Sequence, residues 1–121
     1  MPLNDFFDYT VLNKHADFLR VLININPKHE IFKGHFPGNP VTPGVTQIEM
    51  IRRVLSECLK KELMLTRARD IKYLTPIIPQ QTHHIEINID YTEENGSFET
   101  RCILSHGDKV FTKFRGTFSE Q

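Results

Sequence analysis

One histidine and one carboxylate stand close together near the middle of this 121-residue chain. His35 lies in the segment Gly34–Gly44, which has a proline at every third position, and Glu49 falls one turn into the apolar run that follows. Proline fixes φ and removes a backbone donor, so the segment predicts a stiff, irregular loop. An imidazole can accept a proton at neutral pH, and a carboxyl group in apolar surroundings can donate one. The pair therefore points to acid–base chemistry on a small substrate.

Each of these residues also has a simpler interpretation. His35 could be a loop histidine that bonds only to backbone, and Glu49 stands four residues before Arg53, the order that favours an ion pair on a helix surface. Pro43 and Gly44 could form nothing more than a turn into the helix. Alternatively, the free N–H groups at that helix start could hold a carbonyl oxygen as it gains negative charge. The residues alone leave both interpretations open.

Composition excludes several other classes of function. Lys+Arg and Asp+Glu are both 15, so the formal net charge is zero and no overall field attracts nucleic acid or an anionic membrane. No apolar run approaches the roughly 20 residues of a membrane span, and the N-terminus lacks a signal-peptide pattern, so we expect a cytoplasmic protein. Cys58 and Cys102 match no metal or redox motif and are expected to be buried free thiols. The adjacent His83 and His84 should point to opposite faces of a strand, so no metal site is predicted.

Apolar periodicity predicts one long helix among several strands. Residues 45–63 carry an apolar stripe at helical spacing, and Thr42 and Pro43 suit the N-cap and first helical positions. Period-two alternation predicts strands over residues 18–26, 67–74, 83–91, 97–104 and 109–118. Residues 1–18 show no clear period, and we expect a short helix or turn there. After the helix, strands joined by short turns predict an antiparallel meander that wraps around it, an α+β fold in a single domain over residues 1–121.

The proline-rich segment also resembles a known family. Phe32-Lys33-Gly34-His35-Phe36-Pro37-Gly38-Asn39-Pro40-Val41-Thr42-Pro43-Gly44-Val45, followed by Glu49, is similar to the Gly-His-Phe-Pro…Pro…Pro-Gly-Val loop and glutamate of the FabZ-type 3-hydroxyacyl-[acyl-carrier-protein] dehydratases. Residues 71–79, Ile-Lys-Tyr-Leu-Thr-Pro-Ile-Ile-Pro, look like their Lys-Phe-x-x-Pro-Val-x-Pro strand. The resemblance extends from about Asn24 to Phe118.

This resemblance implies a hotdog fold and a homodimer, or a higher oligomer, with active sites at the subunit interface. In the family the histidine comes from one subunit and the glutamate from the other. By likeness, His35 would remove the C2 proton of a 3-hydroxyacyl thioester and Glu49 would protonate the departing C3 hydroxyl. The Gly44 N–H would hold the thioester carbonyl, and Phe36, Pro43 and Val45 would line the substrate site.

The resemblance also implies a binding partner, and the departures from the family motif leave competing functions open. The acyl group would arrive on the phosphopantetheine arm of acyl carrier protein, in fatty acid or polyene-type acyl chain synthesis, without a metal or redox cofactor. Arg53 stands where the family usually has glutamine, and an ion pair with Glu49 would weaken that residue as an acid. Thr42 and Thr46 replace the common methionine and leucine, and the family's N-terminal motif is missing. A hotdog acyl thioesterase and a non-catalytic subunit of a heteromeric dehydratase are therefore the competing predictions.

Overall fold

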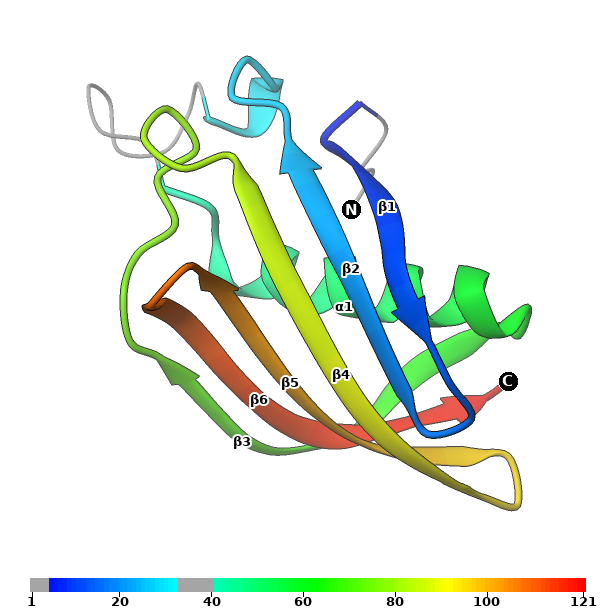
Figure 1. Ribbon diagram of the computed structural model, residues 1–121. Helices are drawn as coiled ribbons and strands as arrows, with labels where there is room; N and C mark the ends of the chain where they lie inside the picture. The colour runs from blue at the N-terminus through cyan, green and yellow to red at the C-terminus, as the bar shows by residue number, and fades with distance from the viewer. Residues whose placement is uncertain (1–4, 33–40) are drawn as a thin grey trace.

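A single antiparallel sheet wraps around one helix. The computed structural model describes residues 5–32 and 41–121, in the order β1 (Phe7–Lys14), β2 (Phe18–Ile25), the 3-10 turn η1 (Glu30–Phe32), α1 (Gly44–Leu59), β3 (Leu63–Tyr73), β4 (His84–Glu94), β5 (Ser97–His106) and β6 (Lys109–Glu120). The six strands are ordered β1-β2-β4-β5-β6-β3, and the sheet curls so that α1 lies along its concave side (Figure 1). This confirms the predicted α+β architecture.

The core forms where α1 meets the concave face of the sheet. On the helix, Met50, Ile51, Val54 and Leu55 are fully buried. The predicted alternation is confirmed for β4 and β5, where one face packs inward and the other is more exposed, whereas β3 is exposed along most of its length. The inward residues include Ile85, Ile87, Ile89 and Tyr91 of β4 and Phe114 and Phe118 of β6.

The helix is shorter than the sequence predicts. It ends at Leu59, because Lys60 adopts a left-handed conformation (φ 56°) and the N–H of Lys61 bonds to the carbonyl of Ser56 at 3.0 Å. This is the six-to-one hydrogen bond that closes many helices, and it turns the chain into β3. At the other end the cap is Pro43 without a side-chain hydrogen bond, and the Thr42 hydroxyl is buried without a partner among the described residues. The predicted Thr42 cap is therefore wrong.

The prediction of a helix or turn near the N-terminus is also wrong. Residues 7–14 form β1, which pairs antiparallel with β2 and places Phe7 opposite Ile25, with a register shift between Val11 and Asn13. Phe7, Tyr9 and Val11 alternate with Asp8 and Thr10, but the alternation stops at Leu12 and Phe7 and Tyr9 alone are partly buried, so the strand signal is short. Only its pairing with β2 and its contacts with the helix define it as a strand.

The strand after the helix pairs differently from the predicted meander. β3 lies beside β6 at the edge of the sheet, and of the strands after the helix β4, β5 and β6 pair as consecutive hairpins. The segment between Tyr73 and His84 is too long for a tight hairpin turn and contains two prolines. It carries the chain from one edge of the sheet back to the strand beside β2, and this crossover has no local sequence signal.

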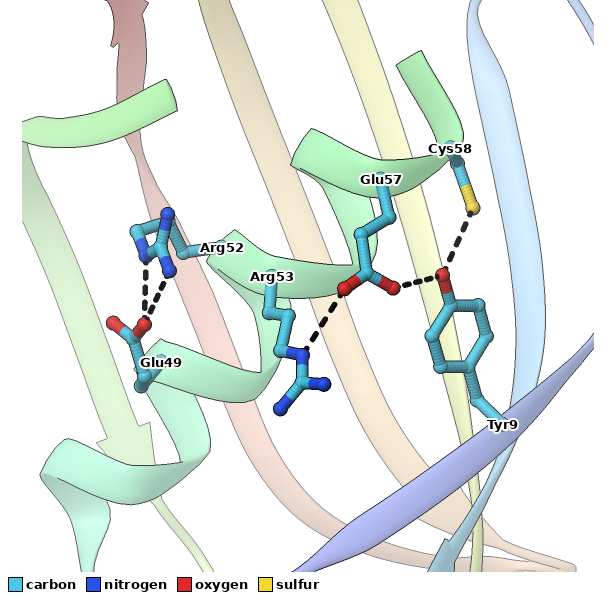
Figure 2. Close-up of polar contacts among 6 residues, drawn as sticks. All are labelled: Tyr9, Glu49, Arg52, Arg53, Glu57 and Cys58. Atoms are coloured by element: carbon cyan, nitrogen blue, oxygen red, sulfur yellow. Dashed lines mark hydrogen bonds and ion pairs between the residues drawn. The ribbon is translucent and has the colours of Figure 1, made fainter. Parts of the chain in front are cut away.

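A polar cluster fastens β1 to the C-terminal half of the helix. The Tyr9 hydroxyl donates a hydrogen bond to Oε1 of Glu57 at 2.7 Å, and Nε of Arg53 donates to Oε2 of the same carboxylate at 3.1 Å (Figure 2). The Arg53 guanidinium also lies over the Phe7 ring, 5.4 Å from its centroid. The hydrogen bond from Tyr9 is the main cause that lowers the pKa of Glu57, with Arg53 adding to it. Glu57 therefore serves as the link between helix and strand.

This link predicts a pH-dependent stability. A carboxyl whose pKa is lowered by folding contributes stability above its unfolded pKa, and that contribution is lost as pH falls through the folded value. Tyr9→Phe should therefore lower the free energy of unfolding by about 0.5–1 kcal/mol at neutral pH, a modest value because the pair is exposed. The deficit should shrink as pH falls through the lowered pKa of Glu57, where this carboxylate becomes protonated.

Chemical denaturation at several pH values measures this difference. The matched control is Tyr91→Phe, because the Tyr91 hydroxyl donates to the uncharged carbonyl of His15 at 3.3 Å. Its deficit should be nearly the same across this acidic range. A Tyr9→Phe deficit that stayed constant with pH would contradict the assigned link.

Candidate active site

The entry into the helix is held by a buried polar network. The N–H of Thr42 donates to the carbonyl of Ile77 at 2.8 Å, and the Gln47 side-chain amide donates to the carbonyl of Thr42 at 3.3 Å. The Thr112 hydroxyl in turn donates to Oε1 of Gln47 at 2.5 Å. Gln47 is 3% exposed, and buried amides that are fully paired restrict the backbone around them. The two segments that carry the family resemblance are thus joined directly at the start of α1.

Sequence reasoning missed Gln47 because a polar residue at a helix start usually faces solvent. Its one available signal is its place among apolar residues, between Thr46 and Ile48.

Gly44, the first residue of α1, is covered by an aromatic ring. A Cβ atom at position 44 would lie 2.5 Å from both Cζ and Oη of Tyr73, a separation that real Cβ atoms essentially never show. Burial of this ring raises the pKa of Tyr73, although about half of the residue remains exposed. Any side chain at position 44 would therefore require the Tyr73 ring to move. The phenol end of Tyr73 lies beside the residue predicted to hold a carbonyl oxygen.

Glu49 lies one turn further on, in a mostly apolar pocket between α1, β3 and β6. The pocket has a volume of about 310 Å³ and is lined by Val45, Ile48, Glu49, Arg52, Met64, Leu65 and Phe118. Val45 and Glu49 are four residues apart and so share one side of the helix. The structure thus brings the predicted acid and the predicted substrate-binding Val45 into one cavity.

The ion pair of Glu49 differs from the one the sequence predicts. Arg52 donates to Oε1 of Glu49 from Nε at 2.8 Å and from Nη2 at 2.5 Å, while Arg53 pairs with Glu57 (Figure 2). The predicted Glu49–Arg53 pair is therefore wrong. The reason is tertiary: Nη1 of Arg52 also reaches the carbonyl of Leu63 at 3.0 Å, and Arg53 is drawn toward β1.

The structure describes part of the predicted site. Pro43, Gly44 and Val45 lie at the helix entry, with Glu49 on the following turn. His35 and Phe36 lie outside the described residues, so their roles stay predictions.

Other chemistry is sparse in the part of the chain that the structure describes. No group of three or more His, Cys, Asp or Glu residues could hold a metal ion there. Both cysteines are free, and Cys102 is buried as expected, whereas Cys58 is partly exposed. The prediction that His83 and His84 point apart is wrong, since their ring centroids are 4.4 Å apart. No helix among residues 5–32 and 41–121 is long and apolar enough to span a membrane.

The comparison with protein families places this geometry in a known group. A family model described as ApeI-like, ApeI dehydratase, matches residues 12–114. The chain therefore belongs to the ApeI-like dehydratase family, whose hotdog fold and FabZ-type relationship agree with the resemblance seen in the sequence.

Individual relatives support the same grouping. The chain is 26% identical over 89 residues to the 3-hydroxyacyl-[acyl-carrier-protein] dehydratase FabZ of Fusobacterium nucleatum, covering 69% of this chain and 63% of that protein. It is 32% identical over 76 residues to FabZ of Herpetosiphon aurantiacus, covering 57% and 54%. The matched part thus spans less than two thirds of these relatives. Among solved structures, the dehydratase heterocomplex ApeI:P from Xenorhabdus doucetiae superposes with a TM-score of 0.71 at 18% identity, covering 93% of this chain and 99% of that one.

The contact between Gly44 and Tyr73 predicts a coupled mutational effect. Gly44→Ala should lower the free energy of unfolding by up to about 1 kcal/mol, because the new methyl group forces the half-exposed Tyr73 ring out of its position. In a Tyr73→Ala background the same change should be neutral, or stabilising by up to about 1 kcal/mol, since alanine favours helix over glycine. A double-mutant cycle measured by denaturant unfolding gives the coupling. Equal effects of Gly44→Ala in both backgrounds would show that the ring does not restrict this position.

Proposed function

We propose that this protein dehydrates (3R)-3-hydroxyacyl groups carried by acyl carrier protein to trans-2-enoyl groups, in fatty acid or polyene-type acyl chain synthesis. Membership in the ApeI-like dehydratase family supports the reaction class. The carrier protein enters through the printed names of the FabZ relatives. The observation that carries the proposal is Glu49 in a mostly apolar pocket one turn from the Gly44 helix entry.

The proposed reaction needs one base, one acid and one oxygen-binding position. His35 takes the proton from C2, Glu49 gives a proton to the C3 hydroxyl, and the hydroxyl leaves as water while the C2–C3 double bond forms. The Gly44 N–H holds the thioester carbonyl as negative charge develops on it, which the helix start favours. Pro43, Val45 and Phe36 pack against the acyl chain. The chemistry requires no metal or redox cofactor beyond the phosphopantetheine arm of the carrier protein.

Removal of either proton-transfer group should slow the reaction strongly. His35→Ala and Glu49→Gln should each lower kcat/KM by about 10²–10⁴-fold for the reverse hydration of a trans-2-enoyl thioester, measured by loss of enoyl absorbance. The control is Glu57→Gln, a carboxylate on the same helix that pairs with Tyr9 and Arg53 and should retain activity.

Two results would redirect the assignment. A wild-type hydration rate no higher than that of either variant, at every acyl chain length tested, would contradict the dehydratase assignment. Release of free thiol from an acyl thioester, dependent on Glu49 but not on His35, would instead favour a hotdog thioesterase.

We further propose that a second copy of the chain packs against the edge strand β3. In the described sheet β3 has a neighbour on one side only, β6. Four exposed apolar residues lie near this edge: Val45 in the first turn of α1, Met64 at the start of β3, and Tyr73 and Leu74 at its end, each at least 45% exposed. Exposed charged residues lie between them on β3: Arg67, Arg69, Asp70 and Lys72. An open edge beside exposed apolar side chains is a favourable surface for association. A homodimer formed here would bring the partner's residues next to the Glu49 pocket.

A charge placed at Met64 should weaken association at this edge. Met64→Glu should raise the dimer dissociation constant by about tenfold or more, because a carboxylate would lose its hydration in the interface. Sedimentation equilibrium measures the change. The matched control is Val11→Glu on the opposite edge strand β1, a residue of nearly equal exposure (44% against 45% for Met64).

The oligomeric state also distinguishes the competing models. A wild-type chain that is monomeric alone, and active only with a related chain, would support the heteromeric alternative. Equal weakening by both substitutions would exclude β3 as the interface.

A further inference from the structure

The side chain of Arg52 connects the Glu49 carboxylate to the edge strand. Its Nε and Nη2 both donate to Oε1 of Glu49, and its Nη1 donates to the carbonyl of Leu63, the first residue of β3. Leu63 is fully buried, so this carbonyl belongs to a part of the backbone that packing holds in place. The guanidinium is therefore fixed at both ends, and it fixes the carboxylate in turn.

The two carboxylate oxygens of Glu49 differ in their hydrogen bonding. Oε1 receives both hydrogen bonds from Arg52, whereas Oε2 receives none from the residues that the structure describes. Apart from the ion pair itself, the pocket is lined by the apolar side chains of Val45, Ile48, Met64, Leu65 and Phe118. Oε2 is thus the oxygen that remains able to exchange a proton with a molecule in this pocket.

We propose that Arg52 is a positioning residue that holds Oε1 of Glu49 and presents Oε2 to the substrate. The inference rests on the proposed dehydratase function and assigns a role to a residue that the family likeness does not indicate. A glutamate on a helix otherwise has several rotamers of similar energy, and misplacing a reacting group by about 1 Å can cost about a hundredfold in rate. Holding one oxygen removes this freedom without blocking the other.

The proposed step is a proton transfer from Oε2 of Glu49. When Oε2 gives its proton to the C3 hydroxyl, the C3–O bond breaks, water leaves and Glu49 becomes a carboxylate. Arg52 keeps all of its protons, since the hydrogen bond to Glu49 raises the pKa of a guanidinium that is already protonated. Glu49 is therefore the proton donor of the pair, and Arg52 is not. Lysine would supply the charge but not the planar fork that reaches both Glu49 and the Leu63 carbonyl.

Steady-state kinetics separate this role from a structural one. Arg52→Gln should lower kcat by about ten- to a hundredfold while KM changes by less than about threefold, because Arg52 orients the acid and does not bind the acyl chain. Arg52→Lys should recover part of kcat. The matched control is Arg53→Gln, the adjacent arginine, which pairs with Glu57 and should keep kcat within about twofold. A kcat for Arg52→Gln equal to that of Arg53→Gln would overturn the proposal.

A spectroscopic measurement tests the contact without activity. In ¹H–¹⁵N spectra of the full chain, the Arg52 Nε–H signal should shift in Glu49→Gln but not in Glu57→Gln, and the Arg53 signal should show the opposite pattern. If the Arg52 Nε–H signal has the same chemical shift in Glu49→Gln as in the wild type, the proposal is overturned even if the enzyme is active. If the wild-type protein shows no dehydration while the Arg52 signal follows Glu49, the proposed function fails and the Arg52–Glu49 contact stands.

Discussion

The structure depends on the burial of one helix in the concave face of a curved sheet. Met50, Ile51, Val54 and Leu55 are fully buried there, and each such side chain contributes about 1.5–3 kcal/mol relative to exposure. Because these four residues must face the sheet, the rotation of α1 about its axis is set. Glu49 and Arg52 then lie on the flank that faces the pocket beside β3, and Arg53 lies on the flank that faces β1.

Polar contacts refine the position that the core sets. At the N-terminal end of α1, Gln47 and Thr112 hold the backbone of Thr42, so the helix entry is rigid where the substrate carbonyl is proposed to bind. At the C-terminal end, Glu57 fastens β1. Two neighbouring arginines therefore perform different tasks. Arg53, the residue that departs from the family's glutamine, belongs to the β1 attachment and not to the Glu49 ion pair.

Much of the fold could be predicted from the sequence because its signals are local. Alternating isoleucines in β4 and the apolar stripe of α1 follow directly from strand and helix periodicity. β1 was not predicted because its alternation covers only the five residues 7–11, of which two are partly buried. The pairing of β3 with β6 was not predicted either, because a strand's partner depends on the path of the whole chain. The helix end at Lys60 depends on where the backbone must turn toward buried Leu63.

For the candidate site, the sequence by itself determined which residues are present and their order: a histidine in a proline-rich loop, a glycine at a helix entry and a glutamate one turn later. These carry the family relationship because loop stiffness and helical spacing are local properties. Only the tertiary structure decided that Tyr73 covers Gly44, that Gln47 is buried and that Arg52 holds Glu49. The contacts of Tyr73 and Gln47 join α1 to other elements, so no spacing along the chain could have revealed them. The i,i+3 spacing of Glu49 and Arg52 is visible in the sequence, but the sequence does not choose between Arg52 and the i,i+4 residue Arg53; the contact of Arg52 with the Leu63 carbonyl does.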